Sequence, residues 1–324
     1  MTKLLNKLAS IAAPKIRQTI RAFKAMKSVP LQNKIAEKLD NYIADFLSGK
    51  IERFCVVPKK PELVGKKIIW QYWYQGINEN TPKIVVSCLN SVKKHSNGYE
   101  IIMLTDKNVS DYICLPDFVF EKFAKGGFSF AKLSNLVRLY LLSAYGGIWL
   151  DATIYLTSPI SETWLQSDFF ALQRSKTPPP DAEIYVKCDP QYFSWHPSFQ
   201  VKILNSFIIA KPNNKIVGDL LSILLEYWKK EAQIGHYFFF QICFNRMMMN
   251  DEWKNLNCEI VGDTDCHKLQ TVALDKFDCR LYSEIAAKSD LHKLTYRFDK
   301  FGQVTQDSFY YAIANEKIEE NKCR

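Results

Sequence analysis

The first 36 residues of this 324-residue chain contain no aspartate or glutamate. The same segment holds eight Lys and Arg side chains, and the formal net charge of the whole chain is +9. The remaining 288 residues carry 35 basic and 34 acidic side chains, so they are close to neutral. A nucleic-acid-binding fold normally spreads its positive charge over the folded surface. The charge distribution therefore argues against a nucleic-acid partner.

Long apolar runs and paired cysteines are also lacking. The uncharged stretch from Ala232 to Asn245 contains Gln, His and Asn and is too short to cross a bilayer. No segment has the uninterrupted apolar region of a secretory signal. The nine cysteines include no Cys-x-x-Cys pair, which argues against a zinc site or a disulfide framework. We therefore expect reduced thiols and a cytoplasmic protein.

The acid-free N-terminus has the pattern of a basic amphipathic helix. Apolar residues recur at helical spacing at Leu4, Leu8 and Ile11, stop at Pro14, and resume at Ile16. Such a helix can lie in a membrane interface with its cations against anionic lipid. It can also be a solvated helix that packs on the body of the protein. We expect a helical extension over residues 1–58, with residues 1–36 contacting an anionic membrane surface at the inner face of the plasma membrane.

The rest of the chain, residues 59–324, alternates between predicted strands and helices. Pro82 at a helix start and Gly146-Gly147 at a helix end mark two boundaries. This alternation predicts an α/β sheet with crossover connections. The strands are expected at 67–74, 99–104, 168–172 and 205–210, with one further strand over 148–151 that continues after a break as 153–156. The helices are expected at 81–94, 106–113, 116–125, 129–145, 215–231 and 235–250.

One segment, residues 130–156, combines features that carry chemistry. Ser134, Asn135 and Arg138 are three or four residues apart and can project along one side of a helix. An arginine beside hydroxyl and amide groups can bind sugar hydroxyls or phosphate. The strand that follows the two glycines delivers Asp151 at its carboxyl end, where open α/β sheets bind ligands. These residues therefore form the candidate site.

The run S-N-x-x-R-x-x-x-L-x-x-x-G-G-x-W-x-D in this segment is similar to the nucleotide-sugar signature of glycosyltransferases with an Asp-x-Asp (DXD) motif. It most resembles the bacterial capsular polysaccharide synthesis protein family, distant relatives of the clostridial toxin sugar-transferase domains. Further matches lie at residues 69–76 and 291–296, so the resemblance covers roughly residues 65–297. Several matches in the expected order are stronger evidence than one short motif.

The resemblance implies a GT-A fold, a Rossmann-like α/β fold that holds a nucleoside diphosphate sugar. It implies catalytic roles for Asp151, Arg138 and Asn135. Many relatives have Asp at this position. Unlike a carboxylate, the amide of Asn135 donates as well as accepts hydrogen bonds. The nucleotide-sugar-binding residues that it implies are Tyr72, Trp73, Gln75, Gly76, Ser134, Asn135, Arg138, Gly147, Trp149, Asp151 and Lys293.

The resemblance also implies a divalent cation, Mn²⁺ or Mg²⁺, held by Asp151. The second DXD carboxylate is absent because Thr153 stands in its place, and this weakens the expected metal site. His292 is a candidate additional ligand, whereas Lys293 could instead balance the diphosphate directly. A literal Asp-x-Asp occurs at residues 263–265, and we interpret it as a solvated turn.

These features predict a glycosyltransferase of capsule, exopolysaccharide or lipopolysaccharide assembly. It would move a sugar from a nucleotide donor, most simply a UDP-sugar, to a glycan or a lipid-linked oligosaccharide, and relatives retain the anomeric configuration. The alternative is a non-catalytic nucleotide-sugar-binding or scaffold protein. The aromatic run at residues 237–240 is expected to fill the core.

Overall fold

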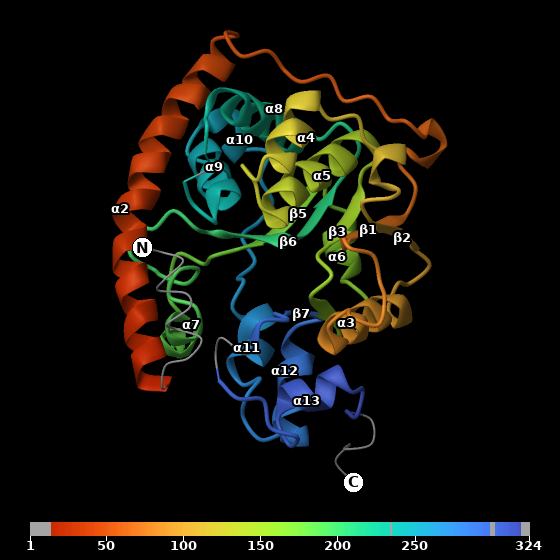
Figure 1. Cartoon of the computed structure of the whole chain (residues 1–324), viewed down its shortest axis with the longest axis vertical. Coiled ribbons are helices and arrows are strands. Elements are labelled where there is room, and N and C mark those ends of the chain that lie inside the picture. The colour runs from red at the N-terminus through yellow and green to blue at the C-terminus, as the bar shows by residue number, and fades with distance from the viewer. Residues whose placement is uncertain (1–13, 234, 299–301, 319–324) are drawn as a thin grey trace.

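A five-stranded sheet forms the centre of the computed structural model, which describes residues 14–233, 235–298 and 302–318 (Figure 1). The strand order is β2-β1-β3-β6-β5. Strands β2, β1 and β3 are parallel, whereas β6 and β5 are antiparallel to their neighbours. The strands are β1 (Ile68–Tyr72), β2 (Glu100–Leu104), β3 (Gly147–Leu150), β5 (Phe169–Gln173) and β6 (Ile203–Ala210).

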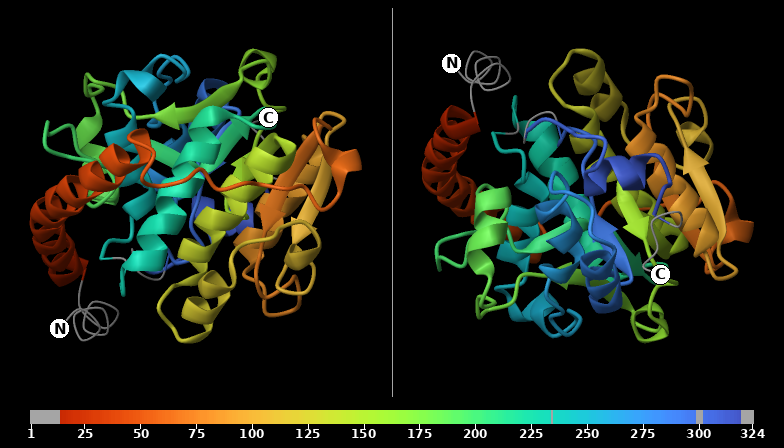
Figure 2. Two further views of the ribbon diagram at one scale, coloured as in Figure 1. Left: turned by 90° about the horizontal axis from the view of Figure 1, so that it is seen from above. Right: turned by 90° about the horizontal axis from the view of Figure 1, so that it is seen from below.

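Helices cover both faces of this sheet, as the two further views show (Figure 2). Every residue of β1 is buried, and so are seven of the eight residues of β6. Strands buried on both faces read as nearly continuous apolar runs. The covering helices are α3 (Lys83–Lys94), α4 (Asp117–Ala124), α5 (Phe130–Tyr145), α8 (Lys215–Lys230) and α9 (Phe239–Met247).

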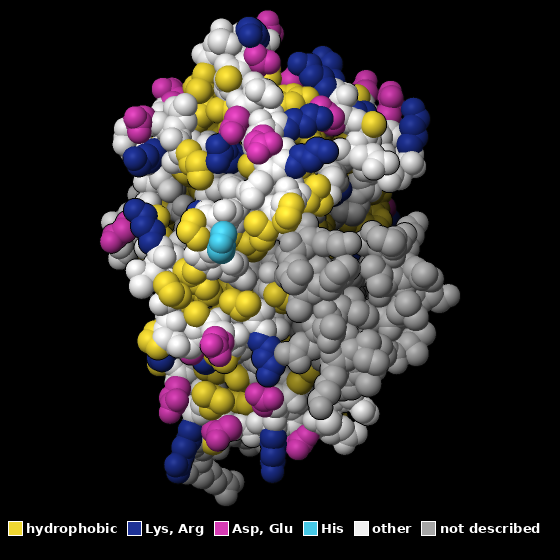
Figure 3. Space-filling view, turned by 90° about the vertical axis from the view of Figure 1, so that its left-hand side faces the viewer, with side chains coloured by type: hydrophobic (Ala, Val, Ile, Leu, Met, Phe, Trp, Pro, Cys, Tyr) yellow, Lys and Arg dark blue, Asp and Glu magenta, His cyan; other side chains and the backbone are white. Residues whose placement is uncertain are grey.

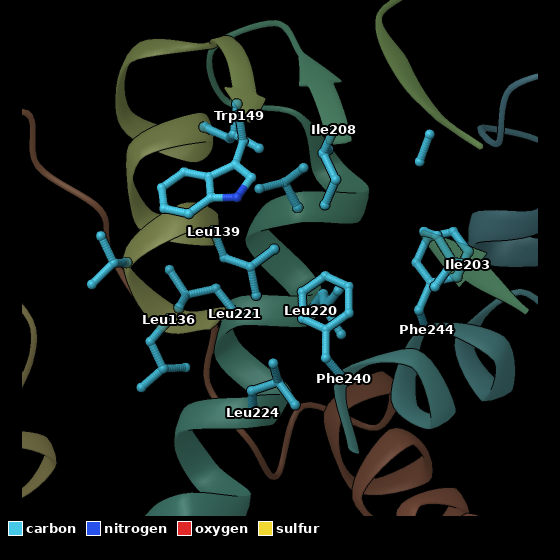
Figure 4. Packing of buried hydrophobic residues seen from close by; sticks show 14 of the residues in the cluster. Leu136, Leu139, Trp149, Ile203, Ile208, Leu220, Leu221, Leu224, Phe240 and Phe244 are labelled. Atoms are coloured by element: carbon cyan, nitrogen blue, oxygen red, sulfur yellow. The ribbon is translucent and has the colours of Figure 1, made fainter. Parts of the chain in front are cut away.

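The layer between α5, α8 and α9 forms the largest part of the core. Leu139 of α5, Leu220 of α8 and Phe240 of α9 meet Trp149 of β3 there (Figure 4). Each of these four side chains is at most 1% exposed. This packing fixes α5 against β3, and these two elements carry the candidate site.

The C-terminal part of the chain builds a smaller unit on a second sheet. Strand β4 (Ile154–Leu156) pairs antiparallel with β7 (Leu291–Lys293) and not with the central sheet. A separate apolar cluster, with Leu269, Ile285 and Phe309 in its centre, lies beneath it. The helices of this unit are α11 (Asp265–Thr271), α12 (Cys279–Lys288) and α13 (Phe309–Ala314).

The predicted α/β class is confirmed, and most element boundaries fall within two residues of those expected. Three predictions are wrong in detail. Residues 106–113 hold only the short 3-10 helix η2 (Val109–Asp111), and the helix expected over 235–250 is limited to α9. Residues 153–156 pair with a strand far away in the sequence, which no local pattern indicates. The remaining short elements are η1 (Pro61–Leu63), α6 (Glu162–Leu165), α7 (Ala182–Cys188) and α10 (Asp251–Lys254).

The N-terminal helix α2 (Pro14–Leu47) runs along one side of the molecule. From residue 28 onward its side chains are described, and Ile35, Leu39 and Ile43 are buried in the core. Arg246 of α9 donates to both carboxylate oxygens of Asp40 at 2.7 Å. This half of α2 therefore packs on the body. The predicted helical residues 4–12 lie outside the described residues.

Figure 3 shows the face that α2 occupies, with Lys and Arg interspersed among Asp and Glu over its described part. Within the described ranges, no helix is long and apolar enough to span a membrane. Seven of the described cysteines are free thiols, as expected. Cys279 departs from that expectation because it takes part in a disulfide bond.

Candidate active site

A tight turn between α5 and β3 sets the position of the candidate site. Gly146 and Gly147 have φ angles of +73° and +99°, which L side chains rarely adopt. A Cβ atom on Gly147 would lie 2.6 Å from the carbonyl oxygen of Ile68. The turn therefore lets β3 run beside β1, and Asp151 follows the carboxyl end of β3. The amide of Asp151 donates to the carbonyl oxygen of Ser206 at 2.9 Å.

Arg138 and Asp151 form the central ion pair of the site. Nη2 of Arg138 lies 2.9 Å from Oδ1 of Asp151, and the Nε1 of Trp149 donates to the same oxygen at 2.8 Å. The arginine side chain is 4% exposed and the aspartate side chain 26% exposed. The carboxylate is thus held from the protein side and remains open toward solvent.

The Arg138 guanidinium is fixed by several further contacts. Nη1 donates to the carbonyl oxygen of Asn205, and Nη2 also donates to Oγ of Ser134 at 3.3 Å. The guanidinium lies 5.0 Å from the ring centre of Trp149 and 5.8 Å from that of Phe240. Its Nε is buried without a hydrogen-bond partner among the described residues. The guanidinium is therefore held by contacts on several sides, while its Nε has no partner among the described residues.

The electrostatics of the site keep Asp151 ionised. Burial alone would raise the pKa of Asp151, but the charges of Arg138 and Lys293 and hydrogen bonds from Trp149 and Ser206 outweigh it. The pKa of Asp151 therefore lies below its usual value. Burial lowers the pKa of Arg138, and the charge of Asp151 opposes that shift. At neutral pH the site holds one carboxylate between two cations.

Lys293 is the second cation of the site, delivered by β7 of the small sheet. Its Nζ lies 4.0 Å from Oδ2 of Asp151 and donates a hydrogen bond to Oγ1 of Thr153. Its side chain is 21% exposed. Burial lowers the pKa of Lys293, and Asp151 opposes the shift. The structure thus brings together Asp151 and Lys293, which are far apart in the sequence.

His292 and Asp151, the two expected metal ligands, are not brought together. Adjacent residues of a strand point to opposite faces. Lys293 reaches Asp151, whereas His292 is completely buried with its Nε2 3.3 Å from Oγ1 of Thr157. No group of three or more His, Cys, Asp or Glu side chains that could hold a metal ion occurs among the described residues. Two cations already contact Asp151, and Thr153 accepts a hydrogen bond from Lys293. These residues therefore do not fit a resident divalent cation.

Asn135 belongs to a chain of hydrogen-bonded amide side chains that its place in the sequence does not predict. Its Oδ1 accepts from Nδ2 of Asn205 at 3.0 Å, and Nε2 of Gln241 donates to Oδ1 of Asn205 at 3.0 Å. The carbonyl of the same Asn205 accepts from Arg138. Asn135 therefore positions the strand residue that holds the arginine. The only signal in the sequence was an amide side chain within the apolar run 203–210.

The expected nucleoside-binding residues lie at the carboxyl end of β1. Because β1 and β3 are parallel neighbours, with Trp70 paired to Trp149, this end lies at the same sheet edge as Asp151. Trp73 packs edge-on against Tyr296 with ring centres 5.5 Å apart. The hydroxyl of Tyr72 is buried without a described partner. Gln75 is exposed, and Gly76 turns the chain with a φ of +74°.

Gly147 lies apart from the other expected binding residues. It begins β3, whereas Asp151 follows the end of that strand, about 13 Å further along. Its close approach to Ile68 gives it a structural role in the turn. The aromatic run is divided as well, because Phe239 and Phe240 are buried as expected but Tyr237 is 67% exposed.

The literal Asp-x-Asp at residues 263–265 is not a solvated turn. Asp263 is completely buried and accepts two hydrogen bonds from Arg174, at 2.7 and 2.8 Å. Tyr192 donates to the same carboxylate at 2.8 Å. Burial alone would raise the pKa of Asp263, but the charge and hydrogen bonds of Arg174 outweigh it and lower the pKa. This structural ion pair joins the residue that follows β5 to the turn that precedes α11.

Fold and site together define an α/β protein with a carboxylate and two cations at the carboxyl edge of its parallel strands. A sequence profile of the capsular polysaccharide synthesis protein family matches residues 20–313. The match begins within α2 and covers most of the chain. The chain therefore belongs to the capsular polysaccharide synthesis protein family.

Two individual proteins resemble the chain at low sequence identity. One relative, O-glycosyltransferase braB from Annulohypoxylon truncatum, is 26% identical over 171 residues. That alignment covers 50% of this chain and 38% of the relative, so the chain spans less than two fifths of the relative's length. A solved structure titled PaToxG Glycosyltransferase is 14% identical, with a TM-score of 0.39, and the match covers 93% of this chain and 98% of that chain.

Proposed function

We propose that the chain is a glycosyltransferase of surface-glycan assembly, such as capsule, exopolysaccharide or lipopolysaccharide synthesis. It would move a sugar from a nucleotide donor, a UDP-sugar in the simplest case, to a hydroxyl of a growing glycan or lipid-linked oligosaccharide. The observation that carries this proposal is the Asp151 carboxylate held between Arg138 and Lys293 at the carboxyl sheet edge. Membership of the capsular family supports the biosynthetic setting.

Asp151 is suited to bind a hydroxyl of the donor. A carboxylate has about four lone-pair positions. Arg138 and Trp149 both donate to Oδ1, and Ser206 donates to the same carboxylate. At least one position is therefore left for a ribose or sugar hydroxyl. Because the pKa of Asp151 is lowered, the group stays an acceptor at neutral pH.

The two cations are suited to the leaving group. Cleavage of the bond between the sugar and the diphosphate leaves negative charge on the diphosphate oxygen, and positioned donors stabilise such charge in the transition state. Arg138 is preorganised by Asn205, Ser134 and the ring of Trp149, so little reorganisation is needed during reaction. In a retaining front-face transfer, the leaving diphosphate can itself accept the proton of the acceptor hydroxyl.

A donor screen tests the proposal. The full chain is incubated with UDP-, GDP-, CDP- and dTDP-sugars and with oligosaccharide acceptors, and the release of nucleoside diphosphate is measured. We expect release with at least one donor and an increase on addition of the right acceptor. Stabilisation of the fold by a nucleotide sugar without any turnover would instead support the non-catalytic scaffold.

We further propose that the N-terminal basic segment places the enzyme peripherally on the cytoplasmic face of an anionic membrane. Eight basic and no acidic residues in residues 1–36 support this placement. Replacing Lys15, Arg17, Arg21 and Lys24 by glutamine should reduce binding to phosphatidylglycerol vesicles about 10-fold or more, measured by co-sedimentation, because each cation near the surface contributes about 1 kcal/mol. Donor turnover should not change. Undiminished vesicle binding by this variant would contradict the placement.

A further inference from the structure

Lys293 lies where the resemblance places a metal ion. In the DXD pattern the second carboxylate would stand at position 153, but here Thr153 offers a hydroxyl that already accepts a hydrogen bond from Nζ of Lys293. The same Nζ lies 4.0 Å from Oδ2 of Asp151. The lysine ammonium therefore lies between the two positions from which a DXD motif would hold a cation.

The backbone fixes Lys293 in this place. Lys293 is directly paired with Ile154 across the small sheet. The amide of the next residue, Leu294, donates to the carbonyl oxygen of Thr153 at 3.0 Å. Residues 153 and 293 are thus joined by main-chain pairing as well as by their side chains. The strand pairing fixes the backbone of Lys293 beside Thr153, and the hydrogen bond to Oγ1 of Thr153 holds the ammonium there.

The ammonium also keeps donors for a ligand. Lysine has three N–H donors, and the bond to Thr153 uses one of them. The distance of 4.0 Å to Asp151 is an ion pair but is too long for a hydrogen bond. With a side chain 21% exposed, Lys293 can be reached from solvent. It can therefore meet a diphosphate oxygen without first releasing Asp151.

The charge of the whole site favours an anion over a metal. Arg138 and Lys293 together outweigh Asp151 by one positive charge. A diphosphate brings two or more negative charges to this centre and is attracted. A divalent cation would have to bind one carboxylate that two cations already approach, with a hydroxyl and no second carboxylate beside it, although Mg²⁺ and Mn²⁺ prefer charged oxygen ligands.

We propose that Lys293 replaces the divalent cation of the DXD site, so that this enzyme binds the donor diphosphate and transfers the sugar without a metal. The inference rests on the proposed function, because it concerns the leaving group of that reaction. The ammonium donates hydrogen bonds to the diphosphate, and the positive charge of Arg138, held on the protein side of Asp151, adds to the attraction. When the bond between the anomeric carbon and the diphosphate breaks, the electron pair stays on the diphosphate oxygen, where the two positive charges stabilise it. The anomeric carbon forms a bond to the acceptor oxygen, and the diphosphate takes up the proton of that hydroxyl.

Titration calorimetry of the full chain with UDP tests this inference, with GDP, CDP and dTDP titrated in the same way. Each titration is made in 1 mM EDTA and again in 1 mM Mn²⁺. We expect the Kd of the preferred nucleotide to agree within about threefold between the two conditions. Binding that requires Mn²⁺ would overturn the role of Lys293 and leave the proposed function intact. No binding of any nucleoside diphosphate in either condition would overturn the proposed function and this inference with it.

Two substitutions of Lys293 test whether its positive charge is what binds the nucleotide. Lys293→Gln removes the charge and should raise the Kd in EDTA at least 30-fold, whereas Lys293→Arg should stay within about fivefold of the parent chain. Lys211→Gln is the matched control, because Lys211 is an exposed lysine that pairs with Asp168 at the surface. Unchanged binding by a folded Lys293→Gln variant would contradict the inference. If that variant does not fold, the comparison of EDTA with Mn²⁺ on the parent chain still decides the question.

Discussion

Replacing Asp151 by asparagine should lower kcat/KM for sugar transfer by about 10³-fold. The substitution keeps the shape of the side chain but removes the charge that holds Arg138 and Lys293 in place. It also weakens the acceptor for a donor hydroxyl. Arg138→Gln should give a loss of similar size, because it removes the cation that positions Asp151 and adds positive charge behind the diphosphate. Steady-state assays of nucleoside diphosphate release measure both effects.

A surface aspartate provides the control for Asp151. Asp168 pairs with Lys211, and its side chain is 76% exposed, so Asp168→Asn should leave kcat/KM within about twofold of the parent. Circular dichroism shows whether the Asp151→Asn variant is folded. A folded variant that retains more than a tenth of the parent activity would mean that the reaction takes place elsewhere.

Mild acid should unfold the protein. Burial lowers the pKa of His236, His267 and His292 to about 4, whereas unfolded histidine titrates near about 6.5. Below pH 6.5 the unfolded chain therefore binds more protons than the folded chain. The stability is fully present above pH 6.5 and is lost as the pH falls toward 4. Three such groups give a slope of up to about 4 kcal/mol per pH unit, enough to unfold a typical domain above pH 4.

Urea unfolding at pH 7.5, 6.5, 5.5 and 5.0 measures this slope. His236 is bonded to Ser28 of α2 at 2.9 Å and accepts from the amide of Phe238 at 3.0 Å. His236→Gln should reduce the slope between pH 5.0 and 5.5 by about 1.4 kcal/mol per pH unit, the contribution of one proton. His196 is exposed, and His196→Gln should leave the slope unchanged. A free energy of unfolding that is constant from pH 6.5 to 5.0 would contradict the burial of neutral histidines.

The parts of the site that sequence could predict depend on local patterns. The helix that carries Arg138 follows from apolar spacing and ends at Gly146 as expected. The apolar run of the next strand stops at Leu150, which predicts that the polar Asp151 follows the carboxyl end of that strand. Parallel strands place their carboxyl ends at one sheet edge, which also brings Trp73 near Asp151. These inferences need no knowledge of distant contacts.

The remainder depends on pairings between residues that are far apart in the sequence. Asn205 holds Arg138 across a separation of 67 residues, and Arg174 pairs with Asp263 across 89. An amide or an acid in the sequence does not reveal which partner it will meet, so Asp263 looked like a solvated residue. The pairing of β4 with β7 fixes which of His292 and Lys293 faces Asp151. The register of this pairing determines which of the two side chains faces Asp151, and the register is known only from the three-dimensional structure.

A crystal structure of the full chain with UDP bound is the most direct test of the central claim, that Asp151, Arg138 and Lys293 form a nucleotide-sugar site. We predict that the diphosphate lies within hydrogen-bond distance of Lys293 on the solvent side of the Arg138–Asp151 pair, with the ribose toward Asp151 and the base beside residues 72–76. Soaking and growth in EDTA should give the same arrangement. A nucleotide bound elsewhere, with these three side chains still paired only to one another, would contradict the account.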